Sequence, residues 1–409
     1  MSERFPKGLS ALAASAALQP LEAMLDIKKQ RKQLYIGIPK ETSFQENRMP
    51  LIPQSVSLLV NNGHEVKVEA GAGAESNFQD SDFSEAGAQI VFSQEEVYKA
   101  DVVIKVAPPS LEELDYIQPR QYLISILQMN MQNEDYIRKL SAKKVTAIGY
   151  EYMHEHTGVY PIIQAMSEIV GSTGILIAAE YLSNAFNGKG ALLGGIAGIP
   201  PTEVVIIGAG TVGEYAARAA IGLGASVKVF DNSIYRLRRL QNRLGSRIYT
   251  STIVPSILLK ELKNADVAIG ALRSSEGRTP VVVTEEMVSE MRVGSVIVDI
   301  SIDQGGCFET SEVTNHSQPV FRKYGVVHYC VPNIASRVSR TASTALSNIF
   351  TPILIEAGAE GGIDEILWKN RVVCTGVYMF RGAITNRYIA ELCKLPFKDL
   401  DLLMAASRI

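Results

Sequence analysis

One segment, residues 204–214 with the sequence VVIIGAGTVGE, constrains the fold of this chain more than any other. An apolar run of the kind found in buried strands leads into three glycines spaced as G-x-G-x-x-G. Gly208 can make a tight turn, Gly210 lets a ligand approach the backbone, and Gly213 allows a following helix to pack closely on the strand. The spacing predicts a strand, a glycine turn and the start of a helix.

A second strand pattern ends on an acidic residue at the distance that this turn requires. Residues 225–231 read ASVKVFD, and Asp231 follows Gly213 by eighteen residues. A helix that begins near Thr211 and Val212 directs free N–H groups and its positive dipole end at phosphates. The Asp231 carboxylate can accept hydrogen bonds from an adenosine ribose and repels a 2′-phosphate. We therefore predict a dinucleotide-binding Rossmann unit that takes NAD rather than NADP.

Length and composition fit a globular protein of two domains. The chain has 409 residues, more than most single domains, and 46% of them are hydrophobic. The net charge of −3 gives no reason to expect a nucleic acid or a membrane surface as partner. Four cysteines without metal-type spacing favour a reducing, cytoplasmic location. His154 and His156 form an isolated pair without further ligands, so we predict no metal site.

Strand and helix patterns divide the chain into a short extension and two α/β units. Residues 1–33 are rich in Ala and Ser and then charged, which favours an appended helix over a signal peptide. Residues 34–161 alternate strand and helix patterns and lack a phosphate motif, so they are the candidate substrate domain. Residues 162–337 hold the glycine motif, and the tail, 338–409, is expected to pack on the first unit. The strands expected in the first unit are residues 34–38, 64–69, 102–106, 122–127 and 145–149.

The predicted fold class is therefore α/β, with two Rossmann-like, doubly wound parallel sheets. The NAD-binding domain is inserted into the substrate domain, between two long helices. Helical periodicity over about residues 162–186 and around residues 344–350 marks these two joining helices.

Polar residues near the carboxyl ends of strands are the candidates for chemistry, because ligands of open parallel sheets bind there. Arg48 follows the first strand, Lys105 lies in the third and Gln128 follows the fourth. An arginine and a lysine could bind a carboxylate, with Asp303 of the other unit facing them across a cleft. A solvated surface position for Arg48 and a turn-capping role for Asp303 stay open as alternatives. A lysine among apolar neighbours is costly unless it is paired, so Lys105 calls for a functional or structural partner.

Further motifs accompany the glycine turn. They are IGIPKET at 36–42 followed by Arg48, AGAG at 70–73, Lys105 within IKV, MSE at 166–168, DQGGCFE at 303–309 and YCVPN at 329–333. Together they resemble the alanine dehydrogenase family and the related soluble domain of nicotinamide nucleotide transhydrogenase. The resemblance covers about residues 34–348, and the DQGGCFE run favours alanine dehydrogenase.

The resemblance implies that the second domain binds NAD(H) and the first an amino or keto acid, with L-alanine oxidised to pyruvate and ammonia. It assigns carboxylate binding to Arg48 and Lys105 and an acid–base role to Asp303. It also implies homo-oligomers, either dimers or hexamers. Cofactor contacts fall on Ser167, Gly208, Gly210, Thr211, Val212, Gly213, Asp231, Arg236 and Asn333. The cluster of Arg236, Arg238 and Arg239 leaves NADP open.

Three positions depart from the family pattern. Gln128 stands where the family has a catalytic histidine, and an amide can hydrogen-bond but cannot exchange a proton near neutral pH. The loop LRSSEG at 272–277 replaces an apolar loop that contains proline, and Ile334-Ala335 replaces Met-Pro. These changes affect the predicted reaction and leave the predicted fold intact.

Three hypotheses follow for the function. In the first, the protein oxidises L-alanine, with Asp303, Lys105 and Gln128 as the candidate catalytic residues and Asp303 doing the acid–base work. In the second, it acts on another amino acid or forms an opine or saccharopine-like product, and Arg273 meets a second carboxylate. In the third, it binds NAD(H) in a regulatory role without catalysis.

Overall fold

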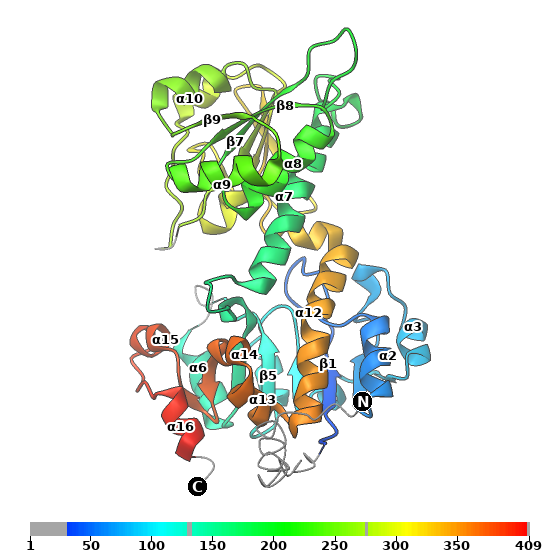
Figure 1. Cartoon of the computed structure of the whole chain (residues 1–409). Coiled ribbons are helices and arrows are strands. Elements are labelled where there is room, and N and C mark those ends of the chain that lie inside the picture. The colour runs from blue at the N-terminus through cyan, green and yellow to red at the C-terminus, as the bar shows by residue number, and fades with distance from the viewer. Residues whose placement is uncertain (1–30, 129–132, 275–276, 407–409) are drawn as a thin grey trace, which may run out of the picture.

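The chain forms two lobes joined by two long helices, α7 (Pro161–Leu182) and α12 (Ser339–Glu360), which pack side by side (Figure 1). The computed structural model describes residues 31–128, 133–274 and 277–406, so the helix predicted within residues 1–33 lies outside the described residues except for the last three. The first lobe combines the N-terminal part of the chain with the C-terminal tail. The second lobe holds the segment between the two helices.

Each lobe is built on one sheet. The strands of the first sheet are β1 (Tyr35–Ile38), β2 (Glu65–Glu69), β3 (Gln89–Val91), β4 (Val102–Ile104), β5 (Tyr122–Ser125), β6 (Thr146–Gly149), β14 (Val377–Phe380) and β15 (Ala383–Ile384). The strands of the second sheet are β7 (Glu203–Ile207), β8 (Ser226–Phe230), β9 (Tyr249–Ser251), β10 (Val267–Gly270), β11 (Val296–Asp299), β12 (Val320–Lys323) and β13 (Val326–Tyr329).

The two sheets share one strand order. The first runs β15-β14-β6-β5-β4-β1-β2-β3 and the second β12-β13-β11-β10-β7-β8-β9. Strands β1 to β6, and likewise β7 to β11 with β13, are parallel. The order reverses beside the first strand of each set, between β1 and β4 and between β7 and β10, which is the doubly wound Rossmann arrangement. The predicted fold class is confirmed.

One edge of each sheet is antiparallel, which the sequence did not predict. Strand β14 pairs with β6 and β15, and β12 pairs with β13, all in antiparallel orientation. Two-residue turns at Arg381-Gly382 and Tyr324-Gly325 connect these strands, and all four residues have positive φ. That is the geometry of the type I′ turn, which closes antiparallel hairpins. The tail thereby completes the first sheet.

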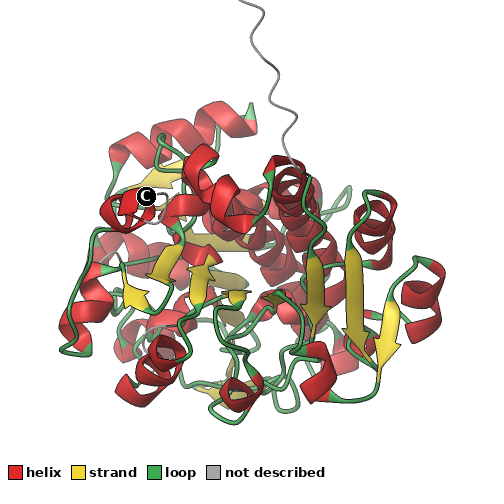
Figure 2. Cartoon of the chain, turned by 90° about the horizontal axis from the view of Figure 1, so that it is seen from below, coloured by secondary structure: helices red, strands yellow, loops and turns green. Residues whose placement is uncertain are grey.

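Helices cover both faces of the sheets (Figure 2). Because both faces are covered, the central strands are mostly apolar, and β4, β6, β10 and β11 are buried at every position. The remaining helices are α2 (Pro53–Asn61), α3 (Asp80–Glu85), α4 (Gln94–Val97), α5 (Glu113–Tyr116), α6 (Glu134–Ala142), α8 (Thr211–Gly222), α9 (Ile234–Leu244), α10 (Pro255–Leu262), α11 (Glu285–Ser289), α13 (Ile363–Lys369), α14 (Arg371–Thr375), α15 (Arg387–Leu392) and α16 (Leu400–Ala406).

Helix α7 is, among the described residues, the one helix long and apolar enough to cross a membrane by length and composition. It packs on α8, α12 and β11. A Cβ atom at Gly171 would overlap the carbonyl oxygen of Val212, and one at Gly174 would lie 2.9 Å from Ile300. The apolar character of α7 therefore has a packing explanation. The predicted domain boundaries fall at the start of α7 and just before α12, and this division stays a prediction.

Candidate active site

The glycine turn of the second lobe connects β7 to α8. Gly208 has φ +119°, and a Cβ atom there would overlap the carbonyl oxygen of Ala271; one at Gly213 would overlap the carbonyl oxygen of Gly208. At Gly210 a Cβ atom would meet nothing within 4 Å, so this backbone faces open space. Gly210 is also the N-cap of α8 and supplies no side-chain cap. The first N–H groups of α8 are therefore available to an anion.

Asp231 follows β8 beside this turn and is buried. Its Oδ2 accepts a hydrogen bond from Ala209 N at 2.8 Å, and its Oδ1 accepts one from Ser233 N at 2.7 Å. Arg236 Nη1 lies 3.8 Å from Oδ2. Each carboxylate oxygen has a second lone pair, so Asp231 can brace the glycine turn and still accept a ribose hydroxyl. The residues predicted to bind the nucleotide at the turn and after β8 thus lie together.

Arg48 lies in the loop after β1, where the two lobes meet. Its Nε and Nη2 donate to the Glu46 carboxylate at 2.7 and 2.6 Å in a bidentate ion pair. Burial lowers the pKa of Arg48, but the Glu46 charge more than offsets this and holds the pKa above its ordinary value. Nη1 is directed to Met166 Sδ on α7 at 3.6 Å, one residue before the predicted cofactor residue Ser167. Glu46 takes two of the five guanidinium N–H groups, so those on Nη1 and the second one on Nη2 are left for an incoming carboxylate.

A chain of contacts runs from Arg48 into the second lobe. Glu46 Oε2 also accepts from Asn333 Nδ2 at 3.1 Å, and Asn333 N donates to Asp303 Oδ1 at 3.2 Å. Asp303 lies in the 3-10 turn η5 (Ile300–Gln304), directly after β11, and is exposed. Desolvation raises its pKa, while the Asn333 N–H and the Arg48 charge lower it. Three of the predicted site residues, Arg48, Asp303 and Asn333, therefore meet across the two lobes.

Further contacts hold the Arg48 loop on the second lobe. Asn47 N donates to Ser336 Oγ at 2.7 Å, and His316 N donates to Gln45 Oε1 at 2.8 Å. A hollow of about 330 Å³ opens beside Asn333 between the lobes. It is lined by Phe44 and Gln45 of the first lobe and by Val313, Thr314, Asn315, His316, Pro332 and Asn333 of the second. The loop that carries Arg48 is thus part of the junction.

Lys105 directly follows β4, which ends two residues earlier than the sequence suggested, and its side chain is fully buried. Its Nζ donates to Glu113 Oε1 at 2.6 Å and lies 3.8 Å from Glu41 Oε2. Burial raises the pKa of Glu41 to about 7, although the Lys105 charge lowers it. Glu41 also interacts electrostatically with Arg48. Lys105 therefore lies inside the first lobe, next to the Arg48 region and already paired.

Gln128 is exposed beyond the end of β5 and has φ +49°. Its backbone N–H donates to Glu151 Oε1 at 3.2 Å, and Leu127 N donates to the same oxygen at 2.7 Å. Within the described part of the chain, no hydrogen bond joins the Gln128 side chain to Arg48 or Asp303. Of the loop at 272–277, Ser275 and Glu276 lie outside the described residues, and Arg273 is exposed.

Four carboxylates that partner these residues were not predicted from the sequence. They are Glu41, Glu46, Glu113 and Glu151. Two signals could have found them. A lysine between apolar neighbours requires an acid, and Glu113 follows Lys105 by eight residues. The carboxyl-end rule, applied to the strand at 145–149, points to Glu151.

Comparison with known proteins shows the family of this chain. The model described as "Alanine dehydrogenase/PNT, N-terminal domain" matches residues 37–170, and that for the C-terminal domain matches residues 174–387. This chain belongs to the alanine dehydrogenase/PNT family. An alanine dehydrogenase of Staphylococcus saprophyticus is 40% identical over 370 residues, which are 90% of this chain and 99% of that protein. The resemblance seen in the motifs is confirmed.

Solved structures of the alanine dehydrogenase/PNT family agree with the fold. An L-alanine dehydrogenase superposes with a TM-score of 0.82 at 36% identity and covers 87% of this chain and 98% of its own. A transhydrogenase from Sinorhizobium meliloti superposes with a TM-score of 0.74 at 24% identity, covering 86% of this chain and 99% of its own, and shows the fold alone.

Proposed function

We propose that the protein is an NAD-dependent alanine dehydrogenase. It converts L-alanine, NAD⁺ and water into pyruvate, ammonium, NADH and a proton, and the reaction is reversible. The observation that carries this proposal is the chain of contacts from Arg48 through Glu46 and Asn333 to Asp303. It sets a cation suited to the substrate carboxylate opposite a carboxyl group suited to proton transfer. The alanine dehydrogenases to which the chain is similar support L-alanine as the substrate.

The geometry of the glycine turn in the second lobe fits a bound dinucleotide. Gly208 and Gly213 leave no room for a side chain, while Gly210 faces open space. The turn, with Thr211, Val212, Asp231, Arg236, Ser167 and Asn333, would hold NAD. When bound, the nicotinamide ring of NAD⁺ would accept the hydride that leaves the α-carbon of the substrate.

Residues of the chain itself bind the substrate and move its protons. Arg48 Nη1 and the charge of Lys105 attract and orient the substrate carboxylate. The Asp303 carboxylate takes a proton from the substrate ammonium, so that the α-carbon can lose hydride. It then releases this proton to solvent, the one proton that the overall reaction sets free, and as a carboxylate again takes a proton from the water that adds to the iminium carbon; this proton is returned to the nitrogen as ammonia leaves. The raised pKa of Asp303 suits a group that must both accept and return protons.

A substrate panel tests this function. We expect NADH formation with L-alanine at alkaline pH, and NADH consumption with pyruvate and ammonium, at rates above those with other amino and keto acids. A faster reaction with an amino acid that carries a second carboxylate would make alanine the wrong substrate. NADH binding without turnover across the whole panel would contradict an enzymatic role.

Asp231 sets the predicted preference for NAD. Replacing Asp231 with serine removes an acceptor for the ribose and the charge that opposes a 2′-phosphate. We expect the ratio of kcat/KM for NAD to that for NADP to fall about 10–100-fold, the size of one or two charge-assisted hydrogen bonds. The melting temperature measured alongside reports any loosening of the turn at Ala209. An unchanged ratio in a folded variant would contradict the assignment.

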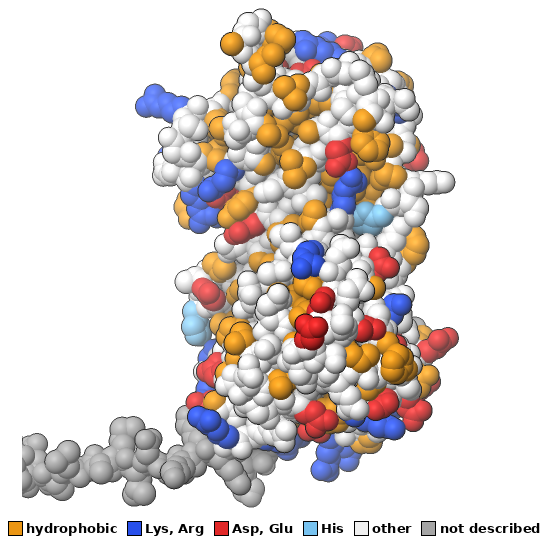
Figure 3. All heavy atoms as spheres, turned by 90° about the vertical axis from the view of Figure 1, so that its right-hand side faces the viewer, with side chains coloured by type: hydrophobic (Ala, Val, Ile, Leu, Met, Phe, Trp, Pro, Cys, Tyr) orange, Lys and Arg blue, Asp and Glu red, His pale blue; other side chains and the backbone are white. Residues whose placement is uncertain are grey.

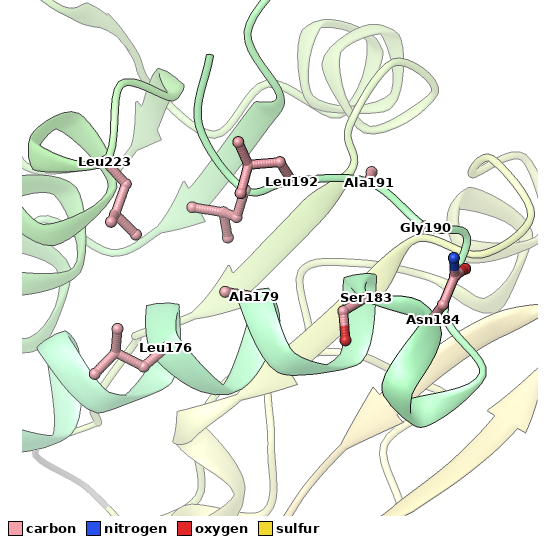
Figure 4. Close-up of a pocket in the computed structure, with 9 residues that line it drawn as sticks. Leu176, Ala179, Ser183, Asn184, Gly190, Ala191, Leu192 and Leu223 are labelled. Atoms are coloured by element: carbon pink, nitrogen blue, oxygen red, sulfur yellow. The ribbon is translucent and has the colours of Figure 1, made fainter. Parts of the chain in front are cut away.

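We also propose that the protein is a homo-oligomer, a dimer or a hexamer. Hydrophobic side chains gather over the second lobe, at the top of Figure 3, and the loop after α7 exposes Leu192, Ile196 and Ile199. Leu176, Leu192 and Leu223 border a hollow of about 370 Å³ between this loop and α7 (Figure 4). Apolar patches of this kind favour association, here with a second copy of the chain. The native mass in solution tests this, and a monomer would contradict it.

All four cysteines, Cys307, Cys330, Cys374 and Cys393, are free and buried. Unpaired thiols support a reducing compartment, and we propose a cytoplasmic location on that ground. Separating the membrane-free extract from the other cell fractions measures it directly.

A further inference from the structure

Glu151 is a half-buried acid that the proposed mechanism does not use. It lies in the 3-10 turn η3 (Tyr150–Tyr152), directly after β6. Strands β1, β4, β5 and β6 are neighbours in that order, and Arg48, Lys105 and Gln128 follow the first three. Glu151 therefore lies at the same edge of the sheet as the candidate substrate residues, one strand beyond Gln128.

One oxygen of Glu151 holds the backbone of the Gln128 segment. Oε1 accepts hydrogen bonds from Leu127 N at 2.7 Å and from Gln128 N at 3.2 Å. Gln128 has φ +49°, a left-handed conformation that a residue with a side chain adopts only when its surroundings hold it there. Glu151 therefore stabilises the backbone that presents the Gln128 amide.

Four tyrosines lie within electrostatic reach of Glu151. Oε2 is buried, and none of the other described residues forms a hydrogen bond to it, while the buried hydroxyls of Tyr136 on α6 and Tyr378 on β14 interact with each other. These two tyrosines, and Tyr150 and Tyr152 of its own turn, interact electrostatically with Glu151. Burial raises the pKa of each of the four, so they stay neutral near pH 7. Oε2 is thus a site for a proton.

The protonation state of Glu151 changes near neutral pH. Burial raises its pKa to about 7, and the backbone N–H groups of Leu127, of Glu151 itself and of Gln128 lower it. A carboxylate accepts N–H hydrogen bonds about twice as strongly as a neutral group does. Raising the pH through this range therefore tightens the hold on the Gln128 segment, and lowering it loosens that hold.

We propose that Glu151 is a positioning residue for substrate: its ionised carboxylate keeps the Gln128 segment in the arrangement that meets the amino acid, and its protonation releases that segment. The proposal rests on the proposed function. It gives the first lobe a pH-responsive group although Gln128 itself cannot titrate.

Kinetic pH profiles test the proposal with three variants. Glu151→Gln keeps an acceptor oxygen for the two N–H groups and removes the titration, Glu151→Ala removes both, and Glu155→Gln is the control at an exposed acid nearby. We expect the ratio of wild-type to Glu151→Gln kcat/KM for L-alanine to rise about tenfold between pH 6 and pH 8. A group with a pKa of about 7 goes from about one-tenth to about nine-tenths ionised over that range, and the ratio cancels the titration of Asp303.

The other variants separate positioning from simple structural support. Glu151→Ala is expected to raise KM for L-alanine about tenfold at all pH values, with a smaller change in kcat, because about two net hydrogen bonds to the segment are lost. Glu155→Gln should match the wild type. A pH-independent ratio of wild type to Glu151→Gln would overturn the proposal even if both variants were less active.

A measurement that does not depend on turnover distinguishes a failure of the role proposed for Glu151 from a failure of the proposed function. Infrared titration of the carboxyl band should show a group titrating near pH 7 that is absent in Glu151→Gln. If the protein oxidises no amino acid, the proposed function fails, and the pyruvate dissociation constant in the presence of NADH replaces kcat/KM in the same pH comparison. A constant that responds to pH identically in wild type and Glu151→Gln would then overturn the role of Glu151.

Discussion

Replacement of Asp303 with asparagine is expected to lower kcat for L-alanine about 10²–10⁴-fold, the usual contribution of a general acid–base group. The asparagine oxygen can still accept the Asn333 N–H, so the contact that joins η5 to the end of β13 is kept. Binding of NADH should therefore stay close to that of the wild type. Steady-state kinetics and an NADH titration by fluorescence measure the two effects separately.

A matched control lies nearby in the chain. Glu312 is an exposed acid that follows Asp303 by nine residues, and Glu312→Gln removes one negative charge without touching the cleft contacts. We expect this variant to keep the wild-type kcat. If Asp303→Asn kept kcat within a factor of about ten, another group would have to carry the proton transfer.

The pH dependence of the same variant gives the direction of the proton transfer. Desolvation raises the pKa of Asp303, and Arg48 lowers it. Alanine oxidation needs the ionised carboxylate, so its rate should rise as the pH increases through this raised pKa. Pyruvate amination needs the protonated form and should fall over the same range. In Asp303→Asn, neither the rise in the oxidation rate nor the fall in the amination rate should be seen.

The architecture was largely predictable, whereas the sheet edges were not. Apolar runs such as those that became β4 and β11 alternate with helical periods, and this pattern selects a doubly wound sheet. The antiparallel hairpins depend on turns at Arg381-Gly382 and Tyr324-Gly325. Their first residues are not the Asn, Asp or Gly that usually announce a type I′ turn, so local sequence carried no signal for them.

The same limit applies to the candidate site. Arg48, Lys105 and Gln128 could be chosen from the sequence because each lies near the carboxyl end of a predicted parallel strand, where ligands bind. The alternation of strands and helices along the chain is enough to predict those parallel strands. The pairing of Arg48 with Glu46, and of both with Asn333, depends on loop conformations and on how the two lobes meet. Neither the loop conformations nor the way the lobes meet follows from a local sequence pattern, so the contact across the lobes appears only in the structure.

Replacement of Lys105 with methionine is expected to lower the free energy of unfolding by about 3–5 kcal/mol, the cost of leaving one partner of a buried ion pair alone. Lys105 and Glu113 are 0% and 2% exposed, and their charged atoms lie 2.6 Å apart. Tyr98 and Gln94 donate to the same Glu113 oxygen but carry no charge that could replace the ammonium. Urea unfolding at neutral pH measures the loss.

A second substitution separates the stability of this pair from its function. In the double variant Lys105→Met/Glu113→Gln the Glu113 charge is removed with that of Lys105, and Glu41, whose pKa burial raises to about 7 and Lys105 lowers, takes up a proton, so most of the lost stability should return. Lys139→Met, which breaks an exposed pair with Asp115, should leave the unfolding transition nearly unchanged. If the refolded double variant stays inactive with L-alanine, Lys105 acts on the substrate as well as on the fold. Recovery of activity would show that its charge serves only to neutralise Glu113.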